Sequence, residues 1–231
     1  MYKLDIKKLK ISNNDNILVD ISFNINSSTA LIGESGSGKS LTLKSLLNLL
    51  PDSLNLKKDI NSNFTLNSET IGLIPQNPFT SLSPMTKISK QFFCSKKKQQ
   101  DLLKLVDLND EVLNKFPSQL SGGQIQRVII AIALSKDIKL LLLDEPTTAL
   151  DVKNKENIIK LVDQLVKRLN ILILFVTHDI ESIKDLCENI VIINKGRIVE
   201  KGSTKEILNK PNNDYTKKLI DSNFKNKDFR K

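Results

Sequence analysis

A glycine-rich loop between an apolar run and a helical pattern constrains this chain more than any other feature. Residues 33–40 match G-x-x-x-x-G-K-[ST] at every fixed position. The loop follows the apolar residues 30–32 and precedes an apolar-rich helical stretch from Ser40 to about Leu50, which Pro51 ends. This order of strand, loop and helix predicts an α/β fold with a parallel sheet.

The residue types in the loop suit the phosphate groups of a nucleotide. Glycines let backbone N–H groups close around an anion at the N-terminus of the following helix. Lys39 would reach the β- and γ-phosphates, and the Ser40 hydroxyl would ligate Mg²⁺. A plain glycine turn is the alternative, and the Lys-Ser pair argues against it. We assign nucleotide binding to Gly33, Glu34, Ser35, Gly36, Ser37, Gly38, Lys39, Ser40 and Leu41.

Two carboxylates follow a second apolar run, residues 140–143. Taken alone, such a pattern more often marks a strand that enters a turn. In a chain that also has a phosphate-binding loop, the two carboxylates indicate a catalytic site, because Mg²⁺ needs a hard oxygen ligand and an attacking water needs a base. We assign Asp144 to the metal and Glu145 to the role of general base.

Hydrophobic periodicity predicts the elements of the core. Apolar residues alternate over residues 17–25 and, more loosely, over residues 4–11, so an antiparallel ribbon is expected at the N-terminus. Apolar runs at residues 71–74, 171–176 and 190–193 have the length of buried strands. The last of these is expected to fold back as a hairpin across Lys195-Gly196.

Residues 77–135 differ, because the patterns at 101–106, 110–115 and 124–134 are all helical. The spacing of Ser203 and Glu206 predicts a capped final helix. We therefore expect a P-loop ATPase core with an antiparallel β subdomain at residues 1–76 and 136–203, an inserted helical subdomain at 77–135, and a C-terminal helix with a basic tail at 204–231.

Composition excludes several classes of protein. The longest apolar run, residues 128–134, is far shorter than the roughly 20 residues that cross a bilayer, and no secretory signal is readable, so we expect a cytoplasmic protein. Cys94 and Cys187 lack metal-ligand spacing and are expected to be free thiols. The net charge of +9 permits a nucleic-acid partner, but the lysines are scattered. The densest basic stretch, residues 217–231, is expected to be a solvated end.

The segment Leu120-Ser121-Gly122-Gly123-Gln124 completes a larger pattern. Together with the phosphate loop and L-L-L-L-D-E-P at residues 140–146, it resembles the ATP-binding subunit of an ABC transporter. Gln76 resembles the Q-loop of that family, Ala149-Leu150-Asp151 its D-loop, and His178, the only histidine, its switch histidine. A lone histidine at a strand end is otherwise usually structural.

The resemblance implies the ABC ATPase fold and a mechanism. Two such chains would sandwich two ATP molecules head to tail, with each phosphate loop facing the partner's Ser121, Gly122, Gly123 and Gln124, and with Asp151 at the same interface. Glu145 would polarise the attacking water, Gln76 would sense water and Mg²⁺, and His178 would contact the γ-phosphate. Coupling to membrane permease subunits would run beside Gln76 and hold the chain on the inner face of the membrane.

Two segments indicate a branch of the family. Residues 76–84 and the residues Asp214-Tyr215-Thr216 resemble the oligopeptide, dipeptide and nickel importers. Peptide carriers of that branch often continue with a cysteine-bearing extension, and its absence here favours nickel or another metal chelate over short peptides. Residues 11–16 lack the aromatic ring that commonly stacks on adenine in the family, and Tyr2 is the only aromatic residue before Phe23.

Other functions and partners are weighed against this interpretation. A detached ATPase of an exporter or of a lipoprotein-release system is one alternative, and the segment 76–84 argues against it. A non-transport ATPase that acts on nucleic acid or ribosomes is another, but such proteins generally carry tandem ATPase domains or a long coiled coil. We expect a second ATPase subunit, identical or related, a permease pair, indirectly a solute-binding protein, and no specific nucleic acid.

Overall fold

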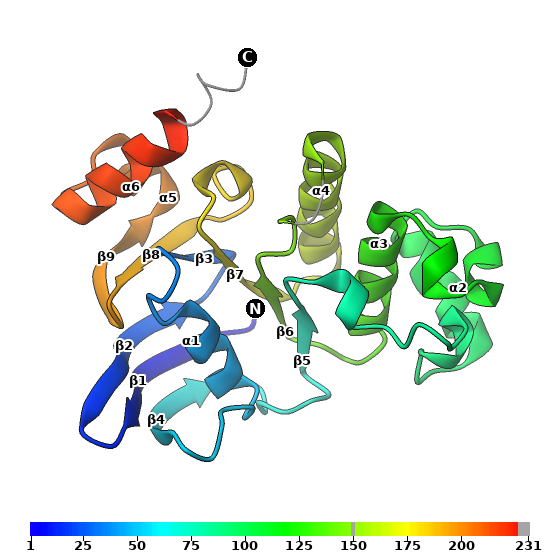
Figure 1. Ribbon diagram of the computed structural model, residues 1–231, viewed down its shortest axis with the longest axis horizontal. Helices are drawn as coiled ribbons and strands as arrows, with labels where there is room; N and C mark the ends of the chain where they lie inside the picture. The colour runs from blue at the N-terminus through cyan, green and yellow to red at the C-terminus, as the bar shows by residue number, and fades with distance from the viewer. Residues whose placement is uncertain (149–150, 226–231) are drawn as a thin grey trace. The chain divides into compact units, whose positions relative to one another are not determined.

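The computed structural model describes residues 1–148 and 151–225, and the backbone forms two compact units. Unit 1 is Met1–Asn67 together with Leu172–Lys231, and unit 2 is Ser68–Ile171. Figure 1 labels the elements of both units. The division into a core, an insertion at residues 77–135 and a C-terminal part stays a prediction.

Unit 1 contains a three-stranded antiparallel sheet in the order β2-β1-β4. Strands β1 (Leu4–Asn13) and β2 (Asn16–Ile25) pair antiparallel, which confirms the predicted ribbon. Strand β4 (Asn55–Ser62) pairs with the other edge of β1 and was not predicted. Most residues of β4 are exposed, so its sequence lacks the apolar alternation that marks a half-buried strand.

A second sheet of unit 1 centres on β3 (Thr29–Ile32). Strands β7 (Leu172–Thr177) and β8 (Asn189–Asn194) lie parallel to β3 on its two sides. Strand β9 (Arg197–Ser203) pairs antiparallel with β8, which confirms the predicted hairpin. Because Ile32 lies opposite Thr177, the segments that follow β3 and β7 leave the sheet at the same edge.

The helices of unit 1 correct two expectations. Helix α1 (Lys39–Leu46) ends before Leu50, because the backbone turns into the left-handed region at Asn48. Helix α5 (Thr204–Asn209) begins at the expected Ser203 cap, but it is not the final helix, because α6 (Asp214–Lys225) follows it.

The expected solvated end begins inside α6, and the expectation is wrong for one face of that helix. Leu219 and Ile220 are only 5% and 8% exposed, so this face is packed, whereas Lys217 and Lys218 are exposed as expected. The apolar spacing was hidden among lysines, which dominated the charge pattern. Residues 226–231 of the same expected tail lie outside the described residues.

Unit 2 contains two parallel strands, β5 (Ile71–Ile74) and β6 (Leu140–Asp144), and Ile74 lies opposite Leu143. Its α-helices are α2 (Lys96–Leu105), α3 (Gly122–Ala133) and α4 (Val152–Leu169). The predicted helix at residues 110–115 is instead a short 3₁₀ helix. The 3₁₀ helices of unit 2 are η1 (Pro78–Thr80), η2 (Ile88–Lys90), η3 (Asp110–Asn114) and η4 (Pro117–Gln119). No helix within residues 1–148 and 151–225 is long and apolar enough to cross a membrane.

Candidate nucleotide site

The glycine-rich loop of unit 1 folds around its own lysine. Lys39 is only 6% exposed, and its Nζ donates to the carbonyl oxygens of Gly33 at 2.7 Å and Glu34 at 2.9 Å. Helix α1 begins at Lys39, and within the described chain no side chain caps it at Gly38. A Cβ on Gly36 would meet no atom within 4 Å, so the tip of the loop is open. A held ammonium group and an uncapped helix N-terminus fit the phosphates of a nucleotide.

The other predicted residues of the loop differ in exposure. Ser35 and Ser40 are exposed, Ser37 is buried, and Leu41 is half-buried in the first turn of α1. The exposed hydroxyl of Ser40 is accessible to a ligand, as the assignment to Mg²⁺ requires. Leu41 offers only its backbone N–H group to an anion.

The turn between β8 and β9 contacts the glycine-rich loop through a backbone hydrogen bond. Gly196 donates its backbone N–H to the carbonyl oxygen of Ser37 at 2.9 Å and accepts from the backbone N–H of Asp20 at 2.7 Å. Gly196 has a φ of 75°, and a Cβ there would lie 2.0 Å from the carbonyl oxygen of Leu18. Only glycine fits this close approach, so the turn sets the position of the loop through a backbone contact.

Tyr215 is a contact of the loop that the sequence did not identify. The backbone N–H of Glu34 donates to the Tyr215 hydroxyl at 3.1 Å. Burial raises the pKa of this phenol, although the bond from Glu34 opposes the shift, so the group stays protonated at neutral pH. The only sequence signal was the segment Asp214-Tyr215-Thr216, which marked a branch of the family and not a contact.

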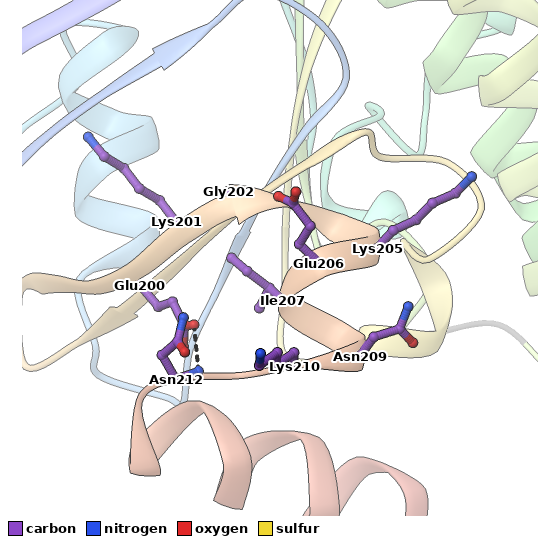
Figure 2. A pocket seen from close by; sticks show the side chains of 9 residues that line it. All are labelled: Glu200, Lys201, Gly202, Lys205, Glu206, Ile207, Asn209, Lys210 and Asn212. Atoms are coloured by element: carbon purple, nitrogen blue, oxygen red, sulfur yellow. Dashed lines mark hydrogen bonds between the residues drawn. The ribbon is translucent and has the colours of Figure 1, made fainter.

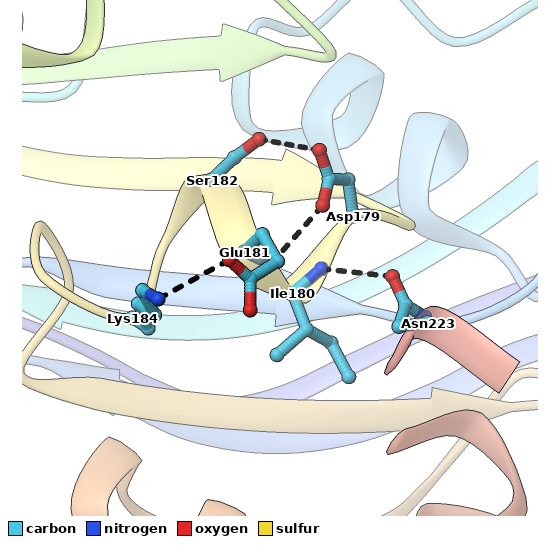
Figure 3. Close-up of polar contacts among 6 residues, drawn as sticks. All are labelled: Asp179, Ile180, Glu181, Ser182, Lys184 and Asn223. Carbon is cyan, nitrogen blue, oxygen red and sulfur yellow. Dashed lines mark hydrogen bonds and ion pairs between the residues drawn. The ribbon is translucent and has the colours of Figure 1, made fainter. Parts of the chain in front are cut away.

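His178 follows β7 directly and is exposed. The backbone N–H of Asp179 donates to Thr177 Oγ1 at 3.0 Å. The Asp179 carboxylate accepts from the backbone N–H of Glu181 at 3.0 Å and from Ser182 Oγ at 2.7 Å, capping the 3₁₀ helix η5 (Ile180–Ser182), as Figure 3 shows. The backbone beside His178 is therefore fixed at the strand edge that also carries the glycine-rich loop.

Unit 2 brings Gln76 and Glu145 together at the ends of β5 and β6. Gln76 Nε2 donates to Glu145 Oε2 at 3.3 Å, and Thr148 Oγ1 donates to the same oxygen at 3.1 Å. Glu145 has a φ of 44°, a strained conformation for a residue with a side chain and one found often at functional sites. Asp144 is half-buried at the last position of β6. Thr148 was missed because its role depends on the fold of the turn that follows Glu145.

The signature segment caps helix α3. Ser121 Oγ accepts from the backbone N–H of Gln124 at 3.3 Å, and Gln124 Oε1 accepts from the backbone N–H of Ser121 at 3.0 Å. This capping box satisfies two N–H groups of the first turn. A hydroxyl that accepts one hydrogen bond still has its own proton to donate, so Ser121 keeps a donor for a ligand. Gly122 and Gly123 are the first two residues of the helix.

Asp151 caps helix α4 through Asn154. Its carboxylate accepts from the backbone N–H of Asn154 at 2.9 Å and from the side-chain Nδ2 of the same residue at 2.6 Å. These bonds, that of the backbone first, lower the pKa of the Asp151 carboxyl group. A Cβ on Gly123 would lie 3.2 Å from Asn154 Oδ1, so Asn154 also borders the signature segment. Ala149 and Leu150 of the expected D-loop lie outside the described residues.

The predicted site residues thus fall into two groups. Unit 1 carries the glycine-rich loop and His178, and unit 2 carries Gln76, Asp144, Glu145, Asp151 and the signature segment. Among the described residues no group of three or more His, Cys, Asp or Glu side chains could hold a metal ion. A cavity of about 520 Å³ in unit 1 contains none of the predicted residues; Figure 2 shows its lining, Glu200, Lys201, Gly202, Lys205, Glu206, Ile207, Asn209, Lys210 and Asn212.

Comparisons with known proteins show the family of the chain. Residues 18–148 match the family described as ABC transporter. The oligopeptide transport ATP-binding protein OppD of Bacillus subtilis (strain 168) is 35% identical over 84% of this chain and 62% of its own length. The dipeptide transport ATP-binding protein DppD of Caldanaerobacter subterraneus subsp. tengcongensis is 38% identical over 85% of this chain and 69% of its own length. The chain therefore spans less than two thirds of the first relative and slightly more of the second.

A solved structure supports the fold. It contains cbiO1 of Clostridium perfringens, described as part of the ABC transporter complex cbiONQ. The TM-score is 0.76 with 26% sequence identity, and the match covers 90% of each chain. The expected fold, a parallel α/β core with an antiparallel ribbon, is confirmed by this match.

Proposed function

The chain belongs to the ATP-binding proteins of the ABC transporter family, and we propose that it is the ATP-hydrolysing subunit of a membrane importer for short peptides. The observation that carries the proposal is the hydrogen bond between Gln76 and Glu145. These two residues are 69 positions apart and were assigned separately from two motifs. Their contact places a side-chain amide beside the carboxylate that would activate water.

The residues of unit 1 would bind the nucleotide. The backbone N–H groups at the start of α1 and the ammonium group of Lys39 would bind the phosphates, and His178 would contact the γ-phosphate. The Ser40 hydroxyl, the Asp144 carboxylate and the Gln76 amide would hold Mg²⁺, which supplies positive charge to the phosphoryl oxygens when it is bound. Since no protein cluster alone suits a metal among the described residues, phosphate oxygens and water would complete its coordination.

Glu145 would act as the general base for water. Gln76 and Thr148 both donate to its Oε2, and its carboxylate would accept a proton from the attacking water. The Thr148 bond restrains the orientation of the carboxylate. Gln76 would adjust that orientation when a nucleotide is present.

A second ATPase subunit, identical or related, would complete each site. The free hydroxyl proton of Ser121 and the N-terminus of α3 would face the γ-phosphate that is bound to the partner subunit. Asp151 would lie at the same interface. Closure of the dimer would then require ATP, and hydrolysis would reopen it.

Permease subunits are the proposed membrane partners. Three large apolar side chains in the segment after Gln76 are exposed: Phe79 by 55%, Met85 by 85% and Phe93 by 90%. Exposed aromatic and methionine side chains are typical of protein interfaces. The chain would be held at the cytoplasmic face of the membrane by this contact, and a solute-binding protein would act on the permeases from the other side.

The proposed cargo follows from the relatives. The names of the two relatives above specify oligopeptide and dipeptide transport. We therefore favour short peptides over a nickel or other metal chelate, which the branch resemblance left open. Nothing in the two units of this chain contacts a cargo in this mechanism, so cargo choice would reside in the other subunits.

Replacement of the proposed base tests the function. We expect Glu145→Gln to lower steady-state ATP hydrolysis by about 10²- to 10⁴-fold, because the amide cannot accept a proton from water. Equilibrium binding of ATP is expected to stay within about twofold, because Lys39 and the loop are unchanged. Glu156→Gln, at an exposed residue of α4, is the matched control and is expected to leave both quantities unchanged. Wild-type turnover in Glu145→Gln would refute the role of Glu145.

Affinity purification from cells separates the alternatives. With ATP-bound Glu145→Gln as bait in mild detergent, we expect a permease pair and a second ATPase to be recovered. Permeases without any genetically linked solute-binding protein would favour an exporter or a lipoprotein-release system. Ribosomes or nuclease-sensitive complexes in place of membrane proteins would contradict the transport function.

A further inference from the structure

Helix α6 makes side-chain hydrogen bonds to both loops at the candidate phosphate-binding edge of unit 1. Near its start, the Tyr215 hydroxyl accepts from the backbone N–H of Glu34, 181 positions earlier in the chain. Near its end, Asn223 Oδ1 accepts from the backbone N–H of Ile180 at 3.2 Å, as Figure 3 shows. Ile180 lies two residues after His178. One helix thus contacts the glycine-rich loop and the segment that carries the histidine.

Both contacts act on backbone groups. A hydrogen bond to a backbone N–H restrains the main chain, whichever side chain the loop presents to a ligand. The Asn223 amide is itself oriented, because its Nδ2 donates to the carbonyl oxygen of Leu219 at 2.9 Å. The side chains of Tyr215 and Asn223 on α6 therefore restrain the backbone at Glu34 and Ile180.

The helix is anchored firmly enough to serve as a support. Its buried residues Thr216, Leu219 and Ile220 have helical spacing and form one face. The Glu200 carboxylate of β9 accepts from the backbone N–H groups of Asn212 at 2.9 Å and Asn213 at 3.2 Å, and Figure 2 shows the first of these bonds. Asn213 Oδ1 in turn accepts from the backbone N–H of Tyr215.

We propose that α6 is a brace for the nucleotide site, in which Tyr215 and Asn223 are positioning residues for the glycine-rich loop and for the segment that follows His178. The proposal rests on the proposed binding of ATP by that loop. Tyr215 restrains the first turn of the loop and so raises its affinity for phosphates. By reciprocity of coupled equilibria, bound ATP stabilises the docking of α6.

Tyr215→Phe isolates the hydroxyl contact. We expect the Kd and the KM for ATP to rise by about two- to tenfold, the effect of one hydrogen bond. We expect kcat at saturating ATP to change by less than about twofold, because Tyr215 touches no reacting group. Tyr2→Phe is the matched control, since Tyr2 and Tyr215 are the only tyrosines and Tyr2 packs elsewhere, against Phe64. Equal Kd values for the wild type and Tyr215→Phe would overturn the brace.

Hydrogen exchange gives a readout that does not depend on ATP. In Tyr215→Phe the amide of Glu34 is expected to exchange faster, while that of Ile180 stays protected. Asn223→Leu should produce the reverse pattern, and Asn223→Asp, which keeps the Oδ acceptor, should restore protection at Ile180. Unchanged exchange at Glu34 in Tyr215→Phe would overturn the role of Tyr215, even if ATP affinity falls.

The reciprocal effect tests the coupling. With ATP and EDTA, which prevents hydrolysis by removing Mg²⁺, the amides of residues 214–223 are expected to gain protection in the wild type but not in Tyr215→Phe. Identical gains in both proteins would refute the coupling through Tyr215. A wild-type chain that binds no ATP would instead refute the proposed function, while the exchange at Glu34 still decides whether Tyr215 holds the loop.

Discussion

The ring of Tyr2 packs against Phe64, with centroids 5.6 Å apart and an interplanar angle of 76°. This edge-to-face pair occupies the only aromatic side chain before Phe23. Ser12, near the end of β1, is half-buried and lies opposite Ile17. The first strands of the chain therefore present no free ring for stacking on an adenine base among residues 1–22.

Nucleotide selectivity is expected to be weak for this reason. Tyr2→Ala should leave the ratio of ATP to GTP affinity unchanged within about twofold, while Ser12→Tyr should tighten ATP binding by about tenfold, the value of one modest stacking contact. Equilibrium titration with both nucleotides measures these ratios. Phe64→Leu, which removes the partner ring, is the control for lost packing. A strong preference for ATP that disappears in Tyr2→Ala would contradict the expectation.

Single residues were predictable where a motif fixes both type and spacing. The partners of Lys39 lie inside its own loop, so local sequence was sufficient. Gln76 and Glu145 were assigned separately, and the structure joins them. Thr148 was missed because its contact depends on the fold of the turn after Glu145. Tyr215 was missed because its contact depends on how the chain returns to the glycine-rich loop 181 residues later.

Some helices and strands were predictable from the sequence and others were not. Buried strands such as β3 and β7 can be predicted from apolar runs in the sequence, because both faces of these strands are covered. Strand β4 pairs with the edge of β1, and most of its side chains are exposed to water. Its sequence therefore contains no apolar run that would predict a strand. Among residues 214–223 of α6, the buried positions Thr216, Leu219 and Ile220 form one face and are interspersed with lysines, so the apolar spacing is weak.

The stability that the Glu200 carboxylate contributes to the packing of α6 is expected to depend on pH. Burial raises the pKa of its carboxyl group, but the Thr216 hydroxyl beside it, the hydrogen bonds from the backbone N–H groups of Asn212 and Asn213, and the charge of Lys217 together lower the pKa by more. The net pKa lies below its ordinary value. The stabilisation is therefore present above the unfolded pKa of about 4.3 and is lost as the pH falls through the lower folded value.

Glu200→Gln is expected to lower the free energy of unfolding at pH 7, and this difference from the wild type should shrink as the pH falls below about 4. Urea unfolding followed by circular dichroism at pH 7, 5 and 3.5 measures the difference. Glu188→Gln, at an exposed glutamate of unit 1, is the control. A difference that stays constant across this range would show that the charge of Glu200 does not hold the segment before α6.

At the scale of the whole molecule, the two units can be followed through their cysteines. Both thiols are free, as the spacing predicted, and one lies in each unit. Cys187 in unit 1 is 4% exposed, and burial raises the pKa of its thiol strongly. Cys94 in unit 2 is half-buried, and burial raises its pKa while the charge of Lys98 opposes the shift. Since the thiolate is the reactive form, the two should differ in reactivity.

Iodoacetamide is therefore expected to label one thiol, Cys94, in the folded chain and both thiols in urea. Mass spectrometry counts the labels, and labelling of Cys187 at increasing urea concentration reports the unfolding of unit 1. Cys94→Ser should leave no reactive thiol in the folded chain. Rapid labelling of Cys187 without denaturant would contradict the packing of unit 1.

The bond between Glu34 and Tyr215 also has a consequence for synthesis. The ribosome makes the glycine-rich loop 181 residues before the tyrosine that holds it. At translation rates of about 5–20 residues per second, this separation is a delay of roughly 10 to 40 s. During that interval the nascent chain has its glycine-rich loop without the contact from α6. If α6 is the proposed brace, full affinity for nucleotide is acquired only after the ribosome has made Tyr215.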